Sequence, residues 1–408
     1  MRILICHNYY KVPGGEDSVV EAEYSLLKDF GHEVILYKRS NTELDSCSPA
    51  GKLKHLFSLG WSSQTHKDIK ALIEKFKPDV AHFHNIFYVI TPAAYFACKE
   101  QGVSVVQSQH NFRLSCSNGL FYRKNRVCED CLKKSLWEGV YHGCYRNSCV
   151  LTTFIAGMLM DHWKKGTWQK MVDVYVTASQ FGRQKLAMAG IPADKIVVKP
   201  NFVYPDPGMR ERLQTKGYAL YVGRLSPEKG VKVLIEAWRS IPNFTLRVIG
   251  VGPLSDFLKS YVKQHNISNV EFRGYVNHEE YDKSMRQAAF LIVPSLAYEN
   301  FPRVVAEAFA YGVPVLASRL GSLEEIIKEE EMGLLSAPGD ISELSQKIHW
   351  MITHEDELLK ISANVRRLYE EKYTAKKNYE CLVNIYNKAM GHRQNSCESL
   401  SCLGGADQ

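Results

Sequence analysis

The chain has 408 residues, of which 45% are hydrophobic and 23% are charged. This composition excludes an intrinsically disordered or fibrous protein for the bulk of the chain, and the length predicts two domains. The charge is uneven: residues 1–200 carry 26 Lys and Arg against 18 Asp and Glu, whereas residues 201–408 carry 25 against 26. A basic half suits an anionic partner such as a phosphate-linked substrate or a lipid surface, although a solvated face is the simpler interpretation. No nucleic-acid-binding signature accompanies the charge, so we expect no nucleic-acid partner.

The first residues, MRILICHN, suggest a short strand and lack the long apolar run of a signal peptide. The longest apolar stretches, such as Val150–Met160, are too short to cross a membrane. We therefore expect a cytoplasmic protein whose 11 Cys are reduced thiols or metal ligands rather than disulfides.

Short apolar runs alternate with segments of helical spacing along the chain. The first helix is expected over Ser18–Phe30, opened by a capping box of Ser18 and Glu21. Two more are expected near Asp68–Phe76 and Pro92–Lys99. The predicted strands are Arg2–Cys6, Glu33–Tyr37, Val80–Phe83, Val103–Gln107, Val172–Ala178, Ile196–Lys199, Tyr218–Val222, Leu246–Ile249, Val270–Arg273, Phe290–Val293 and Pro314–Ala317. This alternation predicts the α/β class, with parallel sheets covered by helices on both faces.

A stretch rich in Pro and Gly separates Lys199 from Tyr218 and predicts an interdomain linker. We expect a doubly wound, Rossmann-like domain on each side. The expected parts are domains at about 1–200 and 210–375, a Cys-rich insert at about 111–150, a helix at 376–390 that packs back across the linker, and a disordered tail at 391–408. Because ligands bind at the carboxyl ends of parallel strands, two facing domains would share a site in the cleft between them.

Gly14 and Gly15 lie between the first strand and the first helix. Two Gly allow the backbone to approach a ligand closely, and a helix N-terminus attracts phosphate. A tight turn capped by Asp17 or Ser18 explains this fragment equally well.

The second domain opens with YVGRLSPEKG, which places Arg224 and Lys229 in one strand-to-helix loop. Two cations at a strand end could hold a diphosphate and stabilise it as a leaving group, although loop cations are usually just solvated. Further on, ENFPRVVAE carries Glu299 in a loop and Glu307 on the following helix. Carboxylates suit the hydroxyl pairs of a ribose or hexose, and the backbone N–H groups near Asn300 could meet phosphate. An isolated Glu307 would be read as an ordinary helix glutamate.

These motifs resemble the donor domain of the family 4 glycosyltransferases, which have the GT-B fold. The pattern VGRLSPEKG followed by E-x7-E carries the resemblance, and GGEDSVV, FRGYV and GVPVLAS also look like family segments. The resemblance covers roughly residues 1–390. It implies transfer of a hexose from a nucleotide-diphosphate sugar, with a UDP-sugar favoured, to a saccharide or lipid-linked saccharide in polysaccharide or glycoconjugate synthesis. It also implies retention of configuration without a catalytic metal, which agrees with the lack of an Asp-x-Asp motif.

The resemblance also implies roles for single residues. Arg224 and Lys229 are expected to hold the diphosphate, Glu299 to contact the donor sugar and Glu307 to contact the ribose. His110 resembles in position a family histidine that contacts the sugar, although a buried structural histidine is the alternative. The expected catalytic residues are His110, Arg224, Lys229 and Glu299. Further donor contacts are expected from Gly14, Gly15, Gly223, Gly274, Tyr275, Val276, Asn300 and Phe301, with Gly15 approaching the phosphate from the N-terminal domain. The acceptor is expected at Glu16, Asp17 and Arg113.

Five of the 11 Cys lie within residues 116–149, and two of them form a Cys-x-x-Cys pair. Four thiolates at such spacing suit a structural zinc ion, which would help a loop-rich insert to fold. The predicted ligands are Cys116, Cys128, Cys131 and Cys144, with His142 or Cys149 as alternatives. Free thiols are the simpler interpretation. A redox role is less favoured, because the pair does not open a helix after a strand.

Two other functions remain open. A nucleotide-sugar epimerase of the same fold would turn over the donor without an acceptor, and a non-catalytic nucleotide-sugar-binding module would release no nucleotide. The basic half also offers two amphipathic segments, Lys52–Phe57 and Leu159–Trp168, for peripheral contact with an anionic membrane at its cytoplasmic face. Core packing of Trp163 and Trp168 is the alternative for the second segment.

Overall fold

The computed structural model describes residues 1–11, 14–46, 48–210 and 217–401. It divides the chain into two compact units. Unit 1 comprises Met1–Gly119, Glu129–Lys199 and Asn378–Gln408, and unit 2 comprises Leu120–Cys128 and Pro200–Lys377. Part of the predicted linker, residues 211–216, and the end of the predicted tail, residues 402–408, lie outside the described residues.

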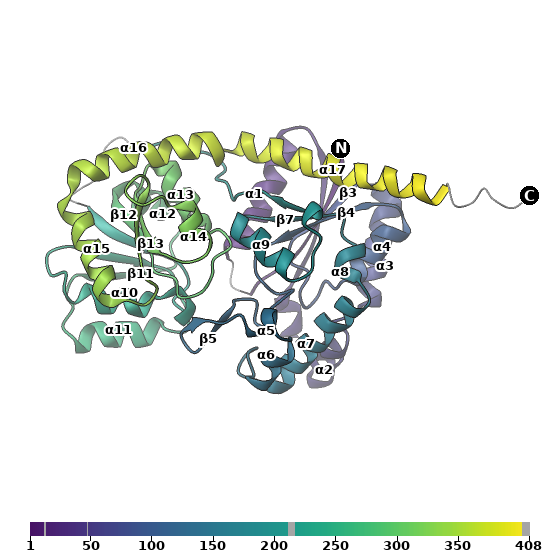
Figure 1. Cartoon of the computed structure of the whole chain (residues 1–408), viewed down its shortest axis with the longest axis horizontal. Coiled ribbons are helices and arrows are strands. Elements are labelled where there is room, and N and C mark those ends of the chain that lie inside the picture. Colours follow the sequence, from purple (N-terminus) through teal and green to yellow (C-terminus); the bar gives the residue numbers. More distant parts are fainter. Residues whose placement is uncertain (12–13, 47, 211–216, 402–408) are drawn as a thin grey trace, which may run out of the picture. The chain divides into compact units, whose positions relative to one another are not determined.

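Unit 1 is built on a six-stranded sheet in the order β2-β1-β3-β4-β7-β8, in which all neighbouring strands are parallel. Figure 1 labels β3, β4 and β7 of this sheet. Its strands are β1 (Arg2–Tyr9), β2 (Glu33–Ser40), β3 (Val80–Phe83), β4 (Ser104–Gln109), β7 (Val174–Thr177) and β8 (Ile196–Val198). Its helices are α1 (Gly15–Asp29), α2 (Pro49–Phe57), α3 (Ser63–Phe76), α4 (Ala93–Glu100), α5 (Asp130–Lys133), α6 (Trp137–Tyr141), α7 (Cys149–Lys164), α8 (Thr167–Lys170) and α9 (Gln180–Met188), with the 3-10 turns η1 (Asn41–Leu44) and η2 (Ala193–Lys195). Leu4 and Cys6 belong to one buried cluster and Ile3 and Ile5 to another. Because successive strand residues point to opposite faces, the sheet is covered on both faces.

Unit 2 contains a second six-stranded parallel sheet, in the order β11-β10-β9-β12-β13-β14. Its strands are β9 (Tyr218–Val222), β10 (Leu246–Ile249), β11 (Val270–Gly274), β12 (Ala288–Val293), β13 (Val315–Ser318) and β14 (Gly333–Ser336). Its helices are η3 (Pro227–Lys229), α10 (Val231–Trp238), α11 (Ser255–Gln264), α12 (His278–Gln287), α13 (Arg303–Tyr311), α14 (Ser322–Ile326), α15 (Ile341–Thr353) and α16 (Glu355–Lys372). This strand order is that of the Rossmann fold, so the two doubly wound α/β domains predicted from the sequence are confirmed.

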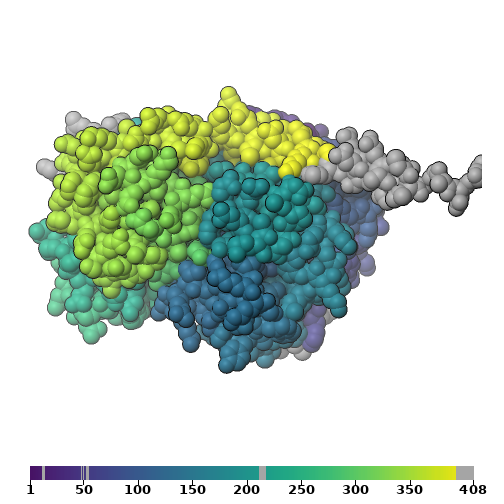
Figure 2. All heavy atoms as spheres, viewed as in Figure 1, coloured from purple at the N-terminus to yellow at the C-terminus, as the bar shows by residue number. Residues whose placement is uncertain are grey.

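The last helix, α17 (Ala375–Ser401), packs on unit 1. Leu382, Ile385, Tyr386 and Ala389 are buried in the cluster that contains Ile5 of β1. Their spacing of three and four residues places them on one face of the helix. The helix extends to Ser401, beyond the predicted end at residue 390. The predicted disorder of the tail at 391–408 stays a prediction. In the space-filling view, residues 378–391 of α17 lie at the surface of unit 1 (Figure 2).

The start of α1 differs from the predicted capping box of Ser18 and Glu21. The helix begins at Gly15, with Gly14 as its N-cap, and Asp17 Oδ2 accepts a hydrogen bond from Gly14 N at 2.8 Å. Ser18 therefore lies inside the helix. Asp17 provides the reciprocal contact that Glu21 was expected to provide, because it stands three residues after the N-cap.

The segment at 111–150 is more ordered than a loop-rich insert. It carries α5, α6 and a two-stranded hairpin of β5 (Tyr122–Arg123) and β6 (Arg126–Val127) that is grouped with unit 2. Phe121 in this segment is fully buried. Large side chains of this segment therefore pack in the interior of the protein.

The two amphipathic segments differ in their packing. Trp168 and Leu159 are 2% and 1% exposed, so the interfacial prediction for Leu159–Trp168 is wrong at both ends, and the core alternative holds there. In the other segment Phe57 is 71% exposed, while the side chains of residues 52–54 lie outside the described part. Among the residues that the structure describes, no helix combines the length and the apolar character that a membrane crossing requires.

Candidate active site

The strand order of unit 2 reverses between β9 and β12, and open parallel sheets bind ligands beside such a switch point. The strand β9 runs into Gly223 and Arg224, and β12 runs into the loop that carries Glu299. Because these strands are neighbours and parallel, their carboxyl ends lie at the same edge. Topology thus brings the two donor motifs predicted from the sequence to one place.

An ion pair joins these motifs directly. Lys229 Nζ donates to Glu299 Oε1 at 2.7 Å, across 70 residues of sequence. Ser295 Oγ donates to the same oxygen at 2.7 Å, and the backbone carbonyl of Glu299 accepts from Ser322 Oγ at 2.7 Å. Glu299 is therefore held in a fixed position beside a partly exposed ammonium.

Arg224 is the more exposed cation of the same loop. Its side chain is 58% exposed and contacts Glu228. The loop packs closely because Gly230 adopts φ +68°, and a Cβ built there would lie 1.8 Å from the carbonyl oxygen of Pro294. Only Gly allows this approach, which keeps the loops after β9 and β12 together.

Glu307 lies on α13 as predicted, and both of its carboxylate oxygens have partners. Arg303 Nε lies 2.9 Å from Oε1, and the Tyr281 hydroxyl donates to Oε2. A ribose at Glu307 would share or replace these contacts. Its predicted role stays a prediction.

The remaining predicted donor residues differ in exposure. Tyr275, after β11, is 74% exposed, whereas Asn300 and Phe301 are buried. The Phe301 carbonyl accepts from Asn201 Nδ2 at 2.8 Å, so this residue is also part of the packing. Gly274 adopts φ +71° at the end of β11, a conformation that favours Gly.

Two further glycines shape this edge and were missed in the sequence. A Cβ on Gly250 would lie 2.0 Å from the Gly223 carbonyl oxygen, and one on Gly252 would lie 2.4 Å from that of Leu225. The signal was present as Gly250-Val251-Gly252 directly after an apolar strand.

The strand order of unit 1 reverses between β1 and β3, and the Gly14 and Gly15 turn follows β1. His7 Nε2 lies 2.7 Å from Asp17 Oδ1. Because the other oxygen of Asp17 accepts from Gly14, this buried carboxylate is engaged on both sides and holds the turn.

A pocket within unit 1 contains the other predicted acceptor residues. Glu16, His110 and Arg113 line it together. Tyr10 Oη donates to Glu16 Oε2 at 3.0 Å. Burial raises the pKa of Glu16 to about 7, which the nearby His7 and Arg113 oppose. The carboxyl group of Glu16 can therefore hold or release a proton near neutral pH.

Three His-Asn pairs lie at the carboxyl ends of three adjacent strands of this sheet and were not recognised as a group. They are His7-Asn8, His84-Asn85 and His110-Asn111, at the ends of β1, β3 and β4. His84 Nδ1 lies 3.0 Å from His110 Nε2. Burial lowers the pKa of His110 to about 3 and holds that of His84 well below its usual value. The repeated dipeptide was the signal in the sequence.

The thiols of the insert partly converge. Cys116 is buried and shares a hydrogen bond with Cys131, which Cys144 also approaches closely enough to interact with electrostatically. Cys128 belongs to unit 2. Of the alternative ligands, Cys149 is exposed, and His142 lies with Asp130 and Glu138.

The comparisons with known proteins cover both units. The family model for Glycosyltransferase Family 4 matches residues 13–206, and the model for Glycosyl transferases group 1 matches residues 209–368. The chain is a glycosyltransferase. Its family models meet close to the boundary between the two sheets, so the resemblance seen in the sequence is confirmed at the level of the family.

Relatives and solved structures agree with this assignment. The glycosyltransferase is 26% identical over 384 residues to an uncharacterized glycosyltransferase of Methanocaldococcus jannaschii, covering 92% of this chain and 95% of that one. It is 26% identical over 229 residues to the amylovoran biosynthesis glycosyltransferase AmsK of Erwinia amylovora, covering 53% and 56%. Its fold is similar to sucrose-phosphate synthase from Thermosynechococcus elongatus, with a TM-score of 0.72 at 17% identity over 96% of this chain and 99% of that one. The glycosyltransferase therefore has the GT-B fold.

Proposed function

We propose that this glycosyltransferase transfers a hexose from a UDP-sugar with retention of configuration. The observation that carries the proposal is the Lys229–Glu299 ion pair beside the exposed Arg224. The two cations would bind the diphosphate and stabilise the negative charge that develops as it leaves, and Glu299 would accept hydrogen bonds from the sugar hydroxyls. These cations supply the charge that a metal supplies in other transferases, so we propose metal-independent chemistry.

The choice of UDP is supported by a structural neighbour. HepE of Anabaena has been solved in complex with UDP-glucose, and its fold covers 98% of this chain with a TM-score of 0.65 at 17% identity. The amylovoran relative supports a role in polysaccharide synthesis.

For the acceptor we propose a saccharide or lipid-linked saccharide bound in the unit 1 pocket. Glu16 and Arg113 line it and offer one acceptor and one donor group to sugar hydroxyls. The Arg113 guanidinium lies 4.2 Å from the centre of the Phe87 ring, which holds it in the pocket wall. An acceptor with an apolar lipid would suit peripheral membrane contact at the cytoplasmic face.

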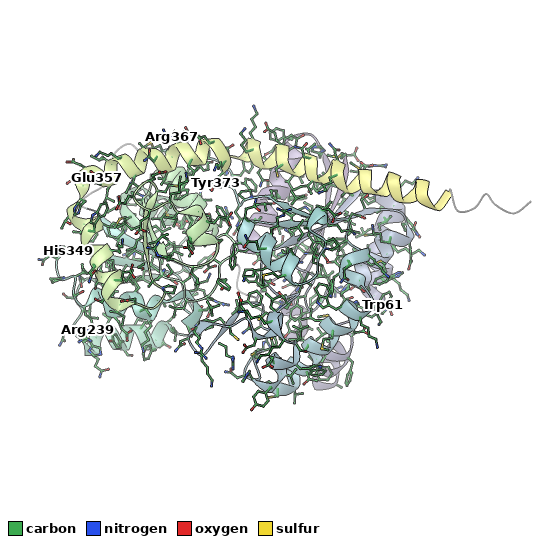
Figure 3. All side chains as sticks on the ribbon, viewed as in Figure 1. Trp61, Arg239, His349, Glu357, Arg367 and Tyr373 are labelled. Atoms are coloured by element: carbon green, nitrogen blue, oxygen red, sulfur yellow. The ribbon has the colours of Figure 1, made fainter. Side chains whose placement is uncertain are left out.

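Exposed apolar side chains of unit 1 support that contact. Phe57 and Tyr141 are 71% and 82% exposed, and Trp61 is 46% exposed. Figure 3 labels the Trp61 side chain on unit 1. Phe57 packs edge-on against Phe154 of α7, with ring centres 5.1 Å apart, so α2 and α7 share this surface. Aromatic side chains on a basic domain suit an anionic interface.

We also propose a structural zinc ion in the insert. The hydrogen bond between Cys116 and Cys131 and the proximity of Cys144 to Cys131 support three thiolate ligands. The Cys-x-x-Cys spacing in the sequence is the argument for Cys128 as the fourth. Four thiolates fit the tetrahedral preference of zinc.

A panel of nucleotide-sugars in a thermal-shift assay tests the donor, because a ligand that binds the native state raises Tm. UDP-hexoses should stabilise the chain more than GDP- or ADP-sugars. Release of UDP should then require a saccharide acceptor. Turnover of the donor alone would identify an epimerase, and binding without any turnover would identify a binding module. Either result would refute the proposed transfer.

A further inference from the structure

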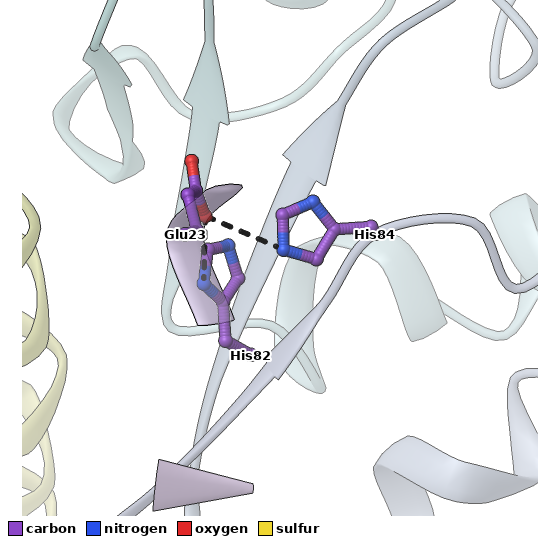
Figure 4. Close-up of side chains that lie close together, drawn as sticks. All are labelled: Glu23, His82 and His84. Carbon is purple, nitrogen blue, oxygen red and sulfur yellow. Dashed lines mark ion pairs between the residues drawn. The ribbon is translucent and has the colours of Figure 1, made fainter. Parts of the chain in front are cut away.

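A chain of buried polar groups in unit 1 connects Glu23 of α1 with His110 at the end of β4. Lys199 Nζ donates to Glu23 Oε1 at 2.7 Å, and Glu23 Oε2 lies 3.5 Å from His84 Nε2 (Figure 4). His84 Nδ1 lies 3.0 Å from His110 Nε2, and the planes of these two rings differ by 16°. Glu23 and His84 are 0% and 2% exposed, so the chain is shielded from solvent.

The Glu23 carboxylate determines which ring nitrogen carries the proton in His84 and, through it, in His110. Glu23 is ion-paired with Lys199 and, as a carboxylate, can only accept hydrogen bonds. Within the described part of the chain, neither Glu23 Oε2 nor His84 Nε2 has a hydrogen-bond partner. A lone pair on His84 Nε2 would face the carboxylate oxygen and be repelled, so Nε2 carries the proton and Nδ1 accepts. His110 Nε2 must then donate to His84 Nδ1, which leaves the lone pair of His110 on Nδ1.

Both rings are uncharged, because burial lowers the pKa of each well below neutral pH. A neutral imidazole has one donor and one acceptor nitrogen. If the proton of His84 is on one ring nitrogen, the other nitrogen must be a hydrogen-bond acceptor. The same holds for His110.

The cluster could also suggest a metal site, because ligand atoms of Glu23, His82 and His84 lie within 4.8 Å of one another. A divalent cation there would lie beside the buried Lys199 ammonium, and like charges repel strongly in such a site. His82 is also engaged at both nitrogens, with Tyr386 Oη at 2.9 Å and Ser108 Oγ at 2.8 Å. These contacts favour a hydrogen-bonded cluster over a metal site.

We propose that Glu23 and His84 are positioning residues that hold His110 with its proton on Nε2 and its lone pair on Nδ1. His110 lines the unit 1 pocket, so it can accept a hydrogen bond there from a ligand hydroxyl. A sugar hydroxyl can donate this bond, whereas an ionised carboxylate or phosphate oxygen cannot. The identity of the ligand as a sugar rests on the proposed function, but the tautomer does not.

The full chain labelled with 15N-histidine tests the tautomers, because protonated and unprotonated imidazole nitrogens resonate far apart. Spectra of His84→Asn and His110→Asn assign the two rings. In the unsubstituted chain we expect the proton on Nε2 of both rings across neutral pH. Combining Glu23→Gln with Lys199→Met removes both charges of the ion pair, so no unpaired charge is left buried. The side-chain amide introduced at position 23 can donate a hydrogen bond to His84. This double variant should reverse both tautomers or give a mixture.

Tyr386→Phe is the matched control. It removes a hydrogen bond from His82 in the same cluster and leaves the Glu23–His84–His110 chain intact, so both tautomers should stay. A proton on His110 Nδ1 in the unsubstituted chain would overturn the proposal, even if the double variant does not fold. Unchanged tautomers in a folded double variant would also overturn it, as would stoichiometric zinc that shifts the nitrogens of His82 and His84.

The transfer reaction gives a second readout. The double variant should lose about 2- to 10-fold in kcat, the range expected when one hydrogen bond between His110 and a ligand hydroxyl is lost. Tyr386→Phe should keep near-normal kcat. A chain that shows the expected tautomers but no sugar transfer would refute the proposed function and leave this inference standing.

Discussion

Replacing Lys229 by Met is the sharpest test of the donor site. The Lys229–Glu299 pair is 2.7 Å long, and its side chains are 32% and 15% exposed. Solvent-accessible pairs of this kind contribute about 0–1 kcal/mol to stability, so Tm should change little. In the transition state, however, the same ammonium would face a leaving diphosphate, and loss of one preorganised contact costs about 2–4 kcal/mol. That cost is roughly a 30- to 1,000-fold decrease in kcat.

The assay is the initial rate of nucleotide release at saturating donor and acceptor, with Tm measured on the same samples. Lys232→Met is the matched control, because it removes one positive charge from the same unit. Lys232 lies on α10, is 50% exposed and pairs only loosely with Glu236 at 3.6 Å, so kcat should stay within about twofold. Normal kcat in Lys229→Met, or an equal decrease in Lys232→Met, would refute the role assigned to Lys229.

Three further predictions concern other parts of the chain. Replacing Glu307 by Ala removes the carboxylate held by Arg303 and Tyr281. Initial rates should show a higher KM for the donor with little change in kcat, and an equal loss of both binding and kcat would contradict a ground-state contact. Elemental analysis should find about one zinc per chain, and Cys131→Ser should reduce it to well below half; purified protein without zinc would rule out the metal proposal. Burial raises the pKa of Glu16 to about 7, so the stability that this group contributes is present below its unfolded pKa and is lost as pH rises through about 7. Thermal unfolding of Glu16→Gln should therefore show a higher Tm than the unsubstituted chain at about pH 8 and little difference at about pH 4, below the unfolded pKa. A difference that does not change with pH would contradict this account.

The strands were the most predictable part of the fold. The bounds of β3, β9 and β10 coincide with those predicted, because strands buried on both faces of a parallel sheet form mainly apolar runs. His82 in β3 and Arg247 in β10 are the exceptions within these three runs. The short strand β14 was missed, since Gly333–Ser336 offers only two apolar residues between polar neighbours. The start of α1 was misplaced because a capping-box pattern occurs at Ser18, whereas Gly14 and Asp17 form the actual cap.

The juxtaposition of Lys229 and Glu299 could be predicted, because each lies in a motif after a strand and the neighbouring parallel strands β9 and β12 bring those motifs together; their roles toward a donor stay predictions. The histidine chain could not be predicted in this way. A His-Asn dipeptide after a strand has no meaning alone, and its significance depends on β1, β3 and β4 being adjacent, which the sequence does not state. The tautomer of His110 depends further on Glu23, a residue of α1 that no strand-end pattern includes. Site residues that belong to one sequence motif can therefore be predicted from the sequence. Site residues that come from different strands can be grouped only when the order of the strands in the sheet is known.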